Sequence, residues 1–378
     1  MNRVLLSKTS YCKYLQCPKM LWLKKYKSYE AIQKANPRIF ENGKKVGILA
    51  QNIFGKRHED IHYQKNFKKM IQLTSQYLEK KPNIITEATF SYENNFCMVD
   101  ILKNDEDGVE IYEVKSSTKV TDVYIDDASF QYYILSNLGL NVKKVCIIYI
   151  NSKYIRQEKL NLDELFNIED ITHLALQKQD EITGNVEMIN DYMALHDRDN
   201  EPIMDIGKQC RKPYPCDFWE YCTRDMPQTD ACDDEPNIDK KAIRDIIDSL
   251  KYPLYFIDYE TYSTPIPEVI GTTPYQQLPF QYSLHIINEE GAKPEHKEYL
   301  ADIDDEDFIR HFAESMIADL PENGSVIVYN KSLERGHVNE KLAGMYPDLA
   351  GEIERINANM VDFMEPFRKK QYYTKEMR

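Results

Sequence analysis

Three residues, Asp100, Glu113 and Lys115, have the types and the spacing needed for metal-dependent chemistry. They lie in two short apolar runs, 96–102 and 108–115, separated by a polar turn that ends in Asp-Gly. Such a turn between two apolar runs is typical of a β-hairpin. The sequence therefore predicts that one hairpin carries all three side chains.

The expected hairpin gathers these side chains at one point. Folding it about Glu106 places Asp100 opposite position 112, beside Glu113, and strand periodicity points Glu113 and Lys115 to the same face. Two carboxylates can hold a hard divalent cation. A nearby lysine can orient a metal-bound water or balance the charge of a phosphate. The triplet is a candidate phosphodiesterase site, although solvated cross-strand ion pairs have the same composition.

The composition indicates an ordinary globular chain of two or three domains. It has 378 residues, of which 42% are hydrophobic, and no apolar run approaches the length of a membrane span. The first residues have too short an apolar core for a signal peptide. We therefore expect a cytoplasmic protein that makes no membrane contact.

The charge distribution is more informative than the net charge of −14. Residues 1–81 hold 18 Lys/Arg against five Asp/Glu, whereas the remaining chain holds 30 against 57. A basic segment on an acidic body indicates nucleic-acid contact. A solvated helical face would give the same imbalance.

The elements around the hairpin predict a mixed α/β domain, because helices and strands alternate along the chain. We expect helices at 9–29, 41–56, 66–80 and 123–138, strands at 84–93 and 145–150, and a long polar helical stretch at 163–198.

An acidic, proline-punctuated segment at 227–241 marks a domain boundary. We therefore predict a first domain at 1–226, an acidic linker at 227–250 and a second α/β domain at 251–378. The second domain is expected to contain strands at 254–258, 280–287 and 325–329, with helices at 305–319 and 332–345.

Four of the eight cysteines have a pattern that suggests a metal or cluster site. Five residues separate Cys210 from Cys216 and Cys216 from Cys222, and Cys17 lies far upstream, before a proline. Four thiolates can hold a [4Fe–4S] cluster or a structural zinc ion. Cys12 is a rival for the fourth ligand, and unrelated free thiols remain the alternative.

The other cysteines have no such pattern. Cys97 and Cys146 fall inside expected strands, where each is best interpreted as a small core residue. Cys232 lies in the acidic linker and has no evident partner.

Together these motifs resemble the RecB-like branch of the PD-(D/E)xK nucleases that carry an iron–sulfur cluster. That branch includes AddB-type and CRISPR-adaptation exonucleases. The segment 6–22 is similar to its opening motif, and Asp100 matches its metal-binding aspartate. Glu113 and Lys115 match its E-x-K, and Gln131 matches the glutamine of its Q-x-x-x-Y motif.

The resemblance, which covers about residues 4–225, implies a restriction-endonuclease-like core with an N-terminal helical arm. It implies that Asp100 and Glu113 bind Mg²⁺ or Mn²⁺, that Lys115 activates water, and that Gln131 orients the scaffold or the DNA backbone. It also implies a structural [4Fe–4S] cluster that closes the domain like a clasp, held by Cys17, Cys210, Cys216 and Cys222.

The chain departs from the family pattern at the metal site. A histidine expected in a G-x-x-x-H motif is replaced by glycine at Gly47, while His58 and His62 stand at the wrong offset. Position 135 is Leu135 where the glutamine motif has tyrosine. Glu87 could supply an extra acidic group, although an exposed strand-end carboxylate is the simpler interpretation.

The second domain resembles DEDD exonucleases of the RNase H-like fold, which hydrolyse phosphodiesters with two metal ions. Asp258 and Glu260 match the first motif, and Glu334, four residues after Asn330, matches the second. Asp362 stands where the family often has a further aspartate. The third motif would lie beyond Arg378, so we expect an incomplete domain. The whole chain resembles a bacterial two-module family that joins a nuclease module to a truncated exonuclease-like module.

These resemblances imply a nuclease acting on DNA, expected to be an exonuclease on single-stranded or free-ended DNA, with possible protein partners in repair, recombination or CRISPR-type pathways. Two alternatives remain. One is a nucleic-acid-binding protein with a degenerate site, and the other an RNA-processing 3′–5′ exonuclease that works through the second domain. The basic arm would grip DNA by charge and by aromatic stacking, unless its aromatic residues form helix core. These residues are Tyr11, Tyr14, Trp22, Tyr26 and Tyr29.

Overall fold

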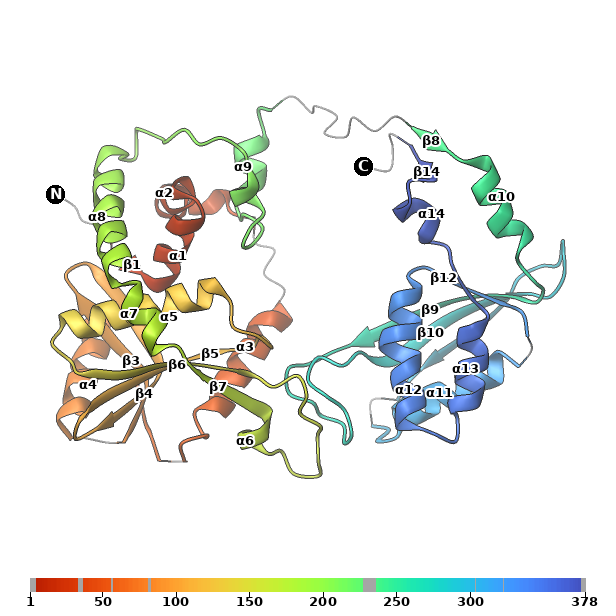
Figure 1. Ribbon diagram of the computed structural model, residues 1–378, viewed down its shortest axis with the longest axis horizontal. Coiled ribbons are helices and arrows are strands. Elements are labelled where there is room, and N and C mark those ends of the chain that lie inside the picture. Colours follow the sequence, from red (N-terminus) through yellow and green to blue (C-terminus); the bar gives the residue numbers. More distant parts are fainter. Residues whose placement is uncertain are drawn as a thin grey trace. The chain divides into compact units, whose positions relative to one another are not determined.

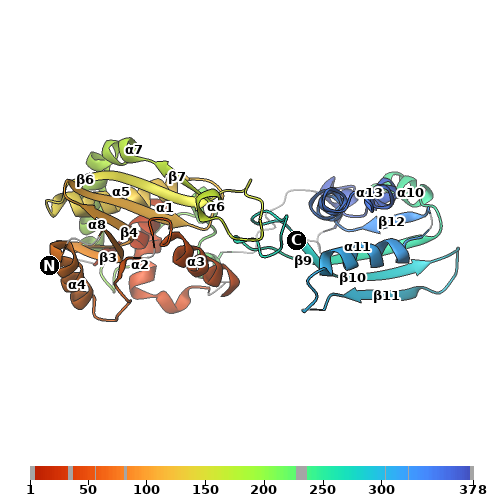
Figure 2. The same ribbon diagram turned by 90° about the horizontal axis from the view of Figure 1, so that it is seen from below.

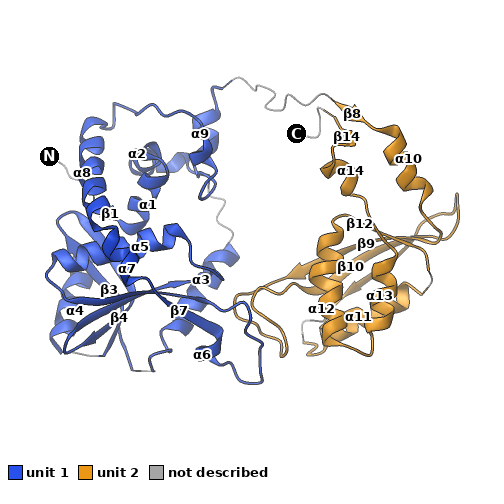
Figure 3. Cartoon of the chain, in the orientation of Figure 1, with its two compact units in different colours: residues 1–227 blue, residues 228–378 orange. Residues whose placement is uncertain are grey.

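The computed structural model divides into two compact units, Met1–Pro227 and Gln228–Arg378 (Figures 1 and 3). It describes residues 5–32, 37–55, 57–80, 83–226, 236–302, 304–321 and 323–374. Both units combine helices with a mixed β-sheet. The α/β class expected from the sequence is therefore confirmed.

Unit 1 is built on one sheet with the strand order β2-β3-β4-β5-β6-β7. Strands β3, β4 and β5 form an antiparallel meander, β6 is parallel to β5, and β7 is antiparallel to β6. A short strand, β1, pairs in parallel with β4. The strands are β1 (Leu6–Ser7), β2 (Glu59–Asp60), β3 (Ile84–Tyr92), β4 (Asn95–Asp105), β5 (Gly108–Lys115), β6 (Val142–Ile150) and β7 (Phe166–Asp170).

The helices of unit 1 surround this sheet, and α5 is the crossover between the parallel strands β5 and β6 (Figure 1). They are α1 (Lys8–Gln16), α2 (Pro18–Tyr26), α3 (Pro37–Ala50), α4 (Phe67–Lys80), α5 (Asp122–Asn137), α6 (Leu162–Leu165), α7 (Thr172–Gln177), α8 (Gln179–Leu195) and α9 (Trp219–Thr223). Two short 3₁₀ turns, η1 (Ser28–Glu30) and η2 (Lys208–Cys210), complete the unit.

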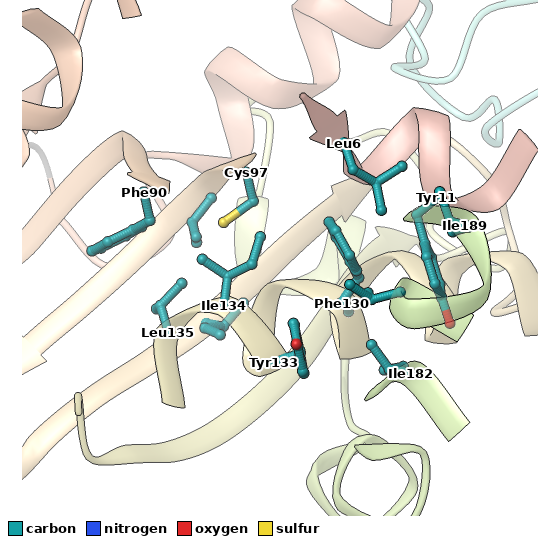
Figure 4. Packing of buried hydrophobic residues seen from close by; sticks show 14 of the residues in the cluster. Leu6, Tyr11, Phe90, Cys97, Phe130, Tyr133, Ile134, Leu135, Ile182 and Ile189 are labelled. Carbon is teal, nitrogen blue, oxygen red and sulfur yellow. The ribbon is translucent and has the colours of Figure 1, made fainter. Parts of the chain in front are cut away.

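The core of unit 1 lies where α5 meets the sheet, α1 and α8. Figure 4 shows Tyr11 of α1 beside Phe130 of α5, and their rings stack with centroids 4.7 Å apart. Ile182 and Ile189 of α8 join the same cluster. Phe130 is fully buried. The N-terminal arm is therefore packed into the core of the unit.

Two expectations for helices are wrong. The stretch 9–29 is two helices, because Cys17 is extended (φ −161°, ψ 114°) and Pro18 starts a new helix. The stretch 163–198 is interrupted by strand β7, where Phe166 is buried and the backbone pairs with β6. Pairing with an open sheet edge overrides the local helical pattern there.

The predicted linker, 227–250, is structured over its second half. Residues 227–235, which include Cys232, lie outside the described residues. Strand β8 (Asn237–Ile238) pairs with β14 (Tyr372–Tyr373), and α10 (Lys240–Asp248) follows it.

Unit 2 is built on a five-stranded sheet in the order β11-β10-β9-β12-β13. Strand β10 is antiparallel to both neighbours, whereas β9, β12 and β13 are mutually parallel; β10 and β11 lie side by side in Figure 2. Strand β11 was not expected from the sequence. The strands are β9 (Leu254–Tyr262), β10 (Leu278–Ile287), β11 (Glu295–Leu300), β12 (Ser325–Val328) and β13 (Met360–Asp362).

Helices pack the core of unit 2 against the sheet, with Phe312 and Met316 of α11 beside Tyr259 of β9. The segment η3 is a π-helix, and α12 continues it. The helical elements are α11 (Phe308–Asp319), η3 (Ser332–Asn339), α12 (Glu340–Met345), α13 (Ala350–Ala358) and α14 (Glu365–Arg368).

Among the described residues, no helix combines the length and the apolar character needed to cross a membrane.

Phe130→Ala should lower the free energy of unfolding of unit 1 by about 3–5 kcal/mol, because it leaves a cavity in the buried core. Both tryptophans, Trp22 and Trp219, lie in unit 1, so urea unfolding followed by their fluorescence reports on this unit alone. Tyr29→Ala is the control, since Tyr29 is 76% exposed and its loss should change stability by less than about 0.5 kcal/mol. Equal effects of the two variants would contradict this account of the core.

Candidate functional site

The hairpin of β4 and β5 places Asp100 beside Glu113, with a register one residue away from the expected one. Ile101, rather than Asp100, lies opposite Tyr112, and Asp105 pairs with Gly108. The turn therefore centres between residues 106 and 107, and Gly108 adopts φ +141°. A Cβ at Gly108 would lie 2.2 Å from the carbonyl oxygen of Asn141, so only glycine fits there.

Glu113 is the centre of the site. It is 1% exposed, and both of its carboxylate oxygens accept hydrogen bonds from other side chains. Lys115 Nζ donates to Oε1 at 2.7 Å, and Gln131 Nε2 of α5 donates to Oε2 at 2.6 Å. The structure thus brings Glu113, Lys115 and Gln131 into direct contact.

Asp100 lies at the edge of the same cluster. Its Oδ2 accepts the backbone N–H of Val114 at 2.7 Å, and its Oδ1 lies 3.8 Å from Lys8 Nζ. Its side chain is 26% exposed, compared with 2% for Glu113, so it is the more open of the two carboxylates.

Two members of the site were missed in the sequence analysis, Lys8 and Asp127. Lys8 Nζ donates to both oxygens of Glu113, at 2.8 and 2.9 Å. Asp127 Oδ2 accepts from Lys115 Nζ at 2.6 Å. Asp127 stands four residues before Gln131, and this helical spacing puts both on one face of α5. That spacing was the available signal for Asp127, whereas Lys8 depends on a contact across 105 residues.

Burial and charge act in opposite directions on the pKa values of these groups. Burial alone would raise the pKa of Glu113, but the charges and hydrogen bonds of Lys115 and Lys8 outweigh it and hold that pKa below its ordinary value. Burial, followed by the charge of Glu113, raises the pKa of Asp100 to about 6. Glu113 is therefore the more acidic carboxyl of the pair.

Glu87 belongs to the electrostatic surroundings of this pair. It has a positive φ of 55° in β3, and burial and then the charge of Asp100 raise its pKa to about 7. The interpretation of Glu87 as an exposed strand-end group is therefore wrong. Gly47, at the position where the resemblance implies a histidine, lies on α3, and a Cβ there would meet no described atom within 4 Å outside its own turn of helix.

The four cysteines expected to act together line one small cavity. Cys17 joins α1 to α2, Cys210 ends η2, and Cys222 lies in α9. Cys216 completes the set, and its Sγ accepts the backbone N–H of Phe218 at 3.4 Å. All four are free thiols. Within the described parts of the chain, however, no group of three or more His, Cys, Asp or Glu is arranged to hold a metal ion.

The first helices are fastened to the last part of unit 1 around these cysteines. Gln16 Nε2 donates to the carbonyl oxygens of Gln209 and Tyr214 at 2.8 and 2.7 Å. Trp22 Nε1 donates to the carbonyl oxygen of Asp197 at 2.9 Å. We call this contact between α1–α2 and residues 196–223 the clasp.

The remaining cysteines and the arm aromatics divide between core and surface. Cys97 and Cys146 are buried, as predicted, and Cys12 is half-buried. Tyr11 and Trp22 are core residues, which contradicts their expected role in stacking on DNA, whereas Tyr29 is 76% exposed.

In unit 2, the acidic residues gather near the ends of β9 and β13. Asp258 and Glu260 are exposed and alternate along β9 with buried Ile257 and Tyr259, so they share one face. Glu334 is 2% exposed in η3. Burial raises the pKa of Glu334 to about 7, and the charges of Asp258 and Asp362 add to the rise.

Asp362 is the remaining member of this acidic group in unit 2. One of its carboxylate oxygens accepts the backbone N–H of Met364 at 2.9 Å, and the other accepts Arg368 Nη2 at 2.7 Å. The buried Oε2 of Glu334 has no hydrogen-bond partner in the part of the chain that the structure describes. The structure thus brings Asp258, Glu334 and Asp362 into one electrostatic environment.

Comparison with models of protein families gives a match in unit 2. Residues 255–378 match the model of a family described as a domain of unknown function (DUF2779). The match covers about a third of the chain and corresponds to most of unit 2. No curated protein matches the chain.

Glu201 provides a pH-dependent test of the clasp. It accepts Lys27 Nζ at 2.6 Å and Tyr221 OH at 2.7 Å, and it pairs with Lys19 at 2.9 Å. Burial opposes its charge, but these hydrogen bonds outweigh burial and lower its pKa from 4.5 to about 2. The stabilisation that the ionised Glu201 carboxylate gives to unit 1 should be complete above pH 4.5 and should be lost as the pH falls towards 2.

Glu201→Gln should therefore destabilise unit 1 by about 1.5–3 kcal/mol at pH 7, and by much less near pH 3. Tryptophan fluorescence during urea unfolding at both pH values measures the difference. Glu220→Gln, an exposed residue of α9, is the control. A difference that does not depend on pH would show that the carboxylate charge is not what fastens the clasp.

Proposed function

We propose that this protein is a metal-dependent nuclease that hydrolyses phosphodiester bonds in DNA at the Asp100–Glu113–Lys115 site. One observation carries the proposal: side chains from α1, β5 and α5 donate hydrogen bonds to the buried carboxylate of Glu113, and the α1 donor, Lys8, also pairs with Asp100 of β4. Burying an ionised carboxylate costs free energy even when a lysine and a glutamine donate hydrogen bonds to it. Groups of this kind are concentrated at functional sites.

The topology of unit 1 supports this assignment. Helix α4 is followed by the meander β3-β4-β5, the crossover α5 and the parallel strand β6. This order agrees with the restriction-endonuclease-like core that the sequence motifs imply. It puts Asp100 and Glu113 on neighbouring strands and Gln131 on the crossover helix.

The donor set fits a hard divalent cation. Asp100 and Glu113 would provide carboxylate oxygens to Mg²⁺ or Mn²⁺. Asp127 Oδ1 and Gln131 Oε1 are buried acceptors that have no hydrogen-bond partner among the described residues. A bound ion would polarise the phosphate and activate water.

The protein side chains have distinct parts in this proposal. Asp127 and Glu113 hold the Lys115 ammonium in place, so it can donate to a water or a phosphate oxygen. Gln131 fixes the orientation of Glu113 through its hydrogen bond to Oε2. The exposed lysines of the basic arm would attract the DNA backbone.

The clasp cysteines fit an iron–sulfur cluster. Four free thiols face one cavity, and its other walls include Met20, Leu23 and Phe218. Cys17, Cys210, Cys216 and Cys222 would hold a [4Fe–4S] cluster as thiolates. The cluster would join the arm to the end of unit 1 and would have a structural role.

Unit 2 is a second candidate active site, because its acidic group agrees with the RNase H-like interpretation. The strand order β11-β10-β9-β12-β13, with only β10 reversed, gives a mixed α/β sheet, which is compatible with that interpretation. Asp258, Glu260 and Glu334 would be its metal-binding carboxylates. This site would support the alternative of an RNA-processing exonuclease.

Lys115→Ala and Asp100→Asn should each lower Mn²⁺-dependent degradation of single-stranded DNA by about 10²–10⁴-fold. Oligonucleotides labelled at the 5′ or the 3′ end reveal both the loss and the direction of cleavage. Lys103→Ala is the matched control, because Lys103 lies on the same hairpin and pairs with Glu110 instead.

Three outcomes are distinguishable in that assay. If wild type and Lys115→Ala are equally inactive but still bind DNA, the protein is a binding module with a degenerate site. If Asp258→Asn abolishes cleavage while Asp100→Asn does not, the activity belongs to unit 2. Testing RNA in parallel separates the two substrates.

The cluster assignment predicts a brown protein that contains about four iron atoms and four sulfides per chain after anaerobic purification. Cys17→Ser and Cys216→Ser should lose the visible absorption and iron. Cys12→Ser is the matched control, because Cys12 is the rival ligand on the same arm and should be dispensable. A colourless protein with stoichiometric zinc would overturn the iron–sulfur assignment.

A further inference from the structure

The carboxylate of Glu113 has no free lone pair. An ionised carboxylate offers about four acceptor positions. Lys115 and Lys8 donate to Oε1, and Gln131 and Lys8 donate to Oε2, so all four are used. A metal ion can bind Glu113 only if one of these donors leaves.

Lys8 is the donor placed where a bound cation would lie. Among the described donors to Glu113, Lys8 is the one that contacts both oxygens, and its ammonium is also 3.8 Å from Asp100 Oδ1. It thus bridges the two carboxylates that would hold a metal. Lys115 differs because Asp127 holds it on its other side.

Two local interactions, a strand pairing and a helix cap, fix Lys8 in this position. Leu6 and Ser7 pair with Asn95 and Phe96 at the start of β4, the strand that carries Asp100. Ser7 Oγ then caps α1 by accepting the backbone N–H of Ser10 at 3.2 Å. Lys8 is consequently the first residue of a helix, where the helix dipole disfavours a positive charge.

The charge balance of the site agrees with a cationic role for Lys8. Asp100, Glu113 and Asp127 are three carboxylates, whereas Lys8 and Lys115 are two ammonium groups. Without Lys8, the carboxylates would exceed the ammonium groups by two, which suits a divalent ion.

We propose that the Lys8 ammonium is a built-in competitor that occupies the metal position and must be displaced when Mg²⁺ or Mn²⁺ binds. This inference rests on the proposed function, because it concerns the same two carboxylates. Lys8 keeps the buried Glu113 paired when no metal is present. Metal binding is thereby coupled to the N-terminal arm, which also carries Cys17.

The test measures Mn²⁺ binding to the full chain by electron paramagnetic resonance. Every protein carries Asp258→Asn, so that the acidic group of unit 2 does not contribute. Lys8→Met should bind Mn²⁺ at least about tenfold more tightly than the parent, which corresponds to about 1.4 kcal/mol. Lys8→Arg keeps the charge and should stay within about threefold of the parent.

Lys143→Met is the charge-matched control, because Lys143 pairs with Asp105 at the far end of the hairpin. It should leave Mn²⁺ affinity unchanged. Asp100→Asn added to Lys8→Met should remove the gain, which assigns it to this site. Lys8→Gln replaces Lys8→Met if circular dichroism shows that the methionine variant is unfolded.

Equal or weaker Mn²⁺ binding by folded Lys8→Met would overturn the inference. If the parent nevertheless degrades DNA and needs Asp100, the proposed function stands without it. If Lys8→Met binds more tightly but no variant cleaves nucleic acid, the competitor role stands and the nuclease proposal fails.

Discussion

The arrangement of unit 1 depends on keeping one buried negative charge, that of Glu113, fully paired. Moving a carboxylate into the interior costs several kcal/mol unless hydrogen bonds and opposite charges compensate. Here the compensation comes from three separate places in the chain, since Lys8 opens α1, Lys115 ends β5 and Gln131 lies on α5. The strand β1, the hairpin and the crossover helix must therefore all be in place for the charge to be tolerated.

Much of this arrangement could be predicted from local sequence. The hairpin follows from its Asp-Gly turn, and strand alternation puts Glu113 and Lys115 on one face. Gln131 was identified through a family motif on the next helix. The predicted pairing of Asp100 was wrong by one residue, because the observed turn has two residues between Asp105 and Gly108. This turn depends on the close approach of Asn141 to Gly108.

The features that escaped prediction depend on distant contacts. Lys8 reaches Glu113 across more than a hundred residues, and no local pattern marks that pairing. Strand β7 forms because its backbone pairs with the open edge of β6, although the sequence of β7 continues a helical pattern. Tyr11 and Trp22 looked suited to DNA stacking, but α5, α8 and the loop after α8 bury them.

The clasp also has a consequence for the order in which the chain can fold during synthesis. Cys17 and Trp22 leave the ribosome early, whereas their partners at residues 197–222 follow about 200 residues later. At about 5–20 residues per second, the arm waits at least roughly ten seconds for these partners. Until then the hydrophobic face of α1 and α2 is only partly covered, so the growing chain exposes apolar surface that the finished protein hides.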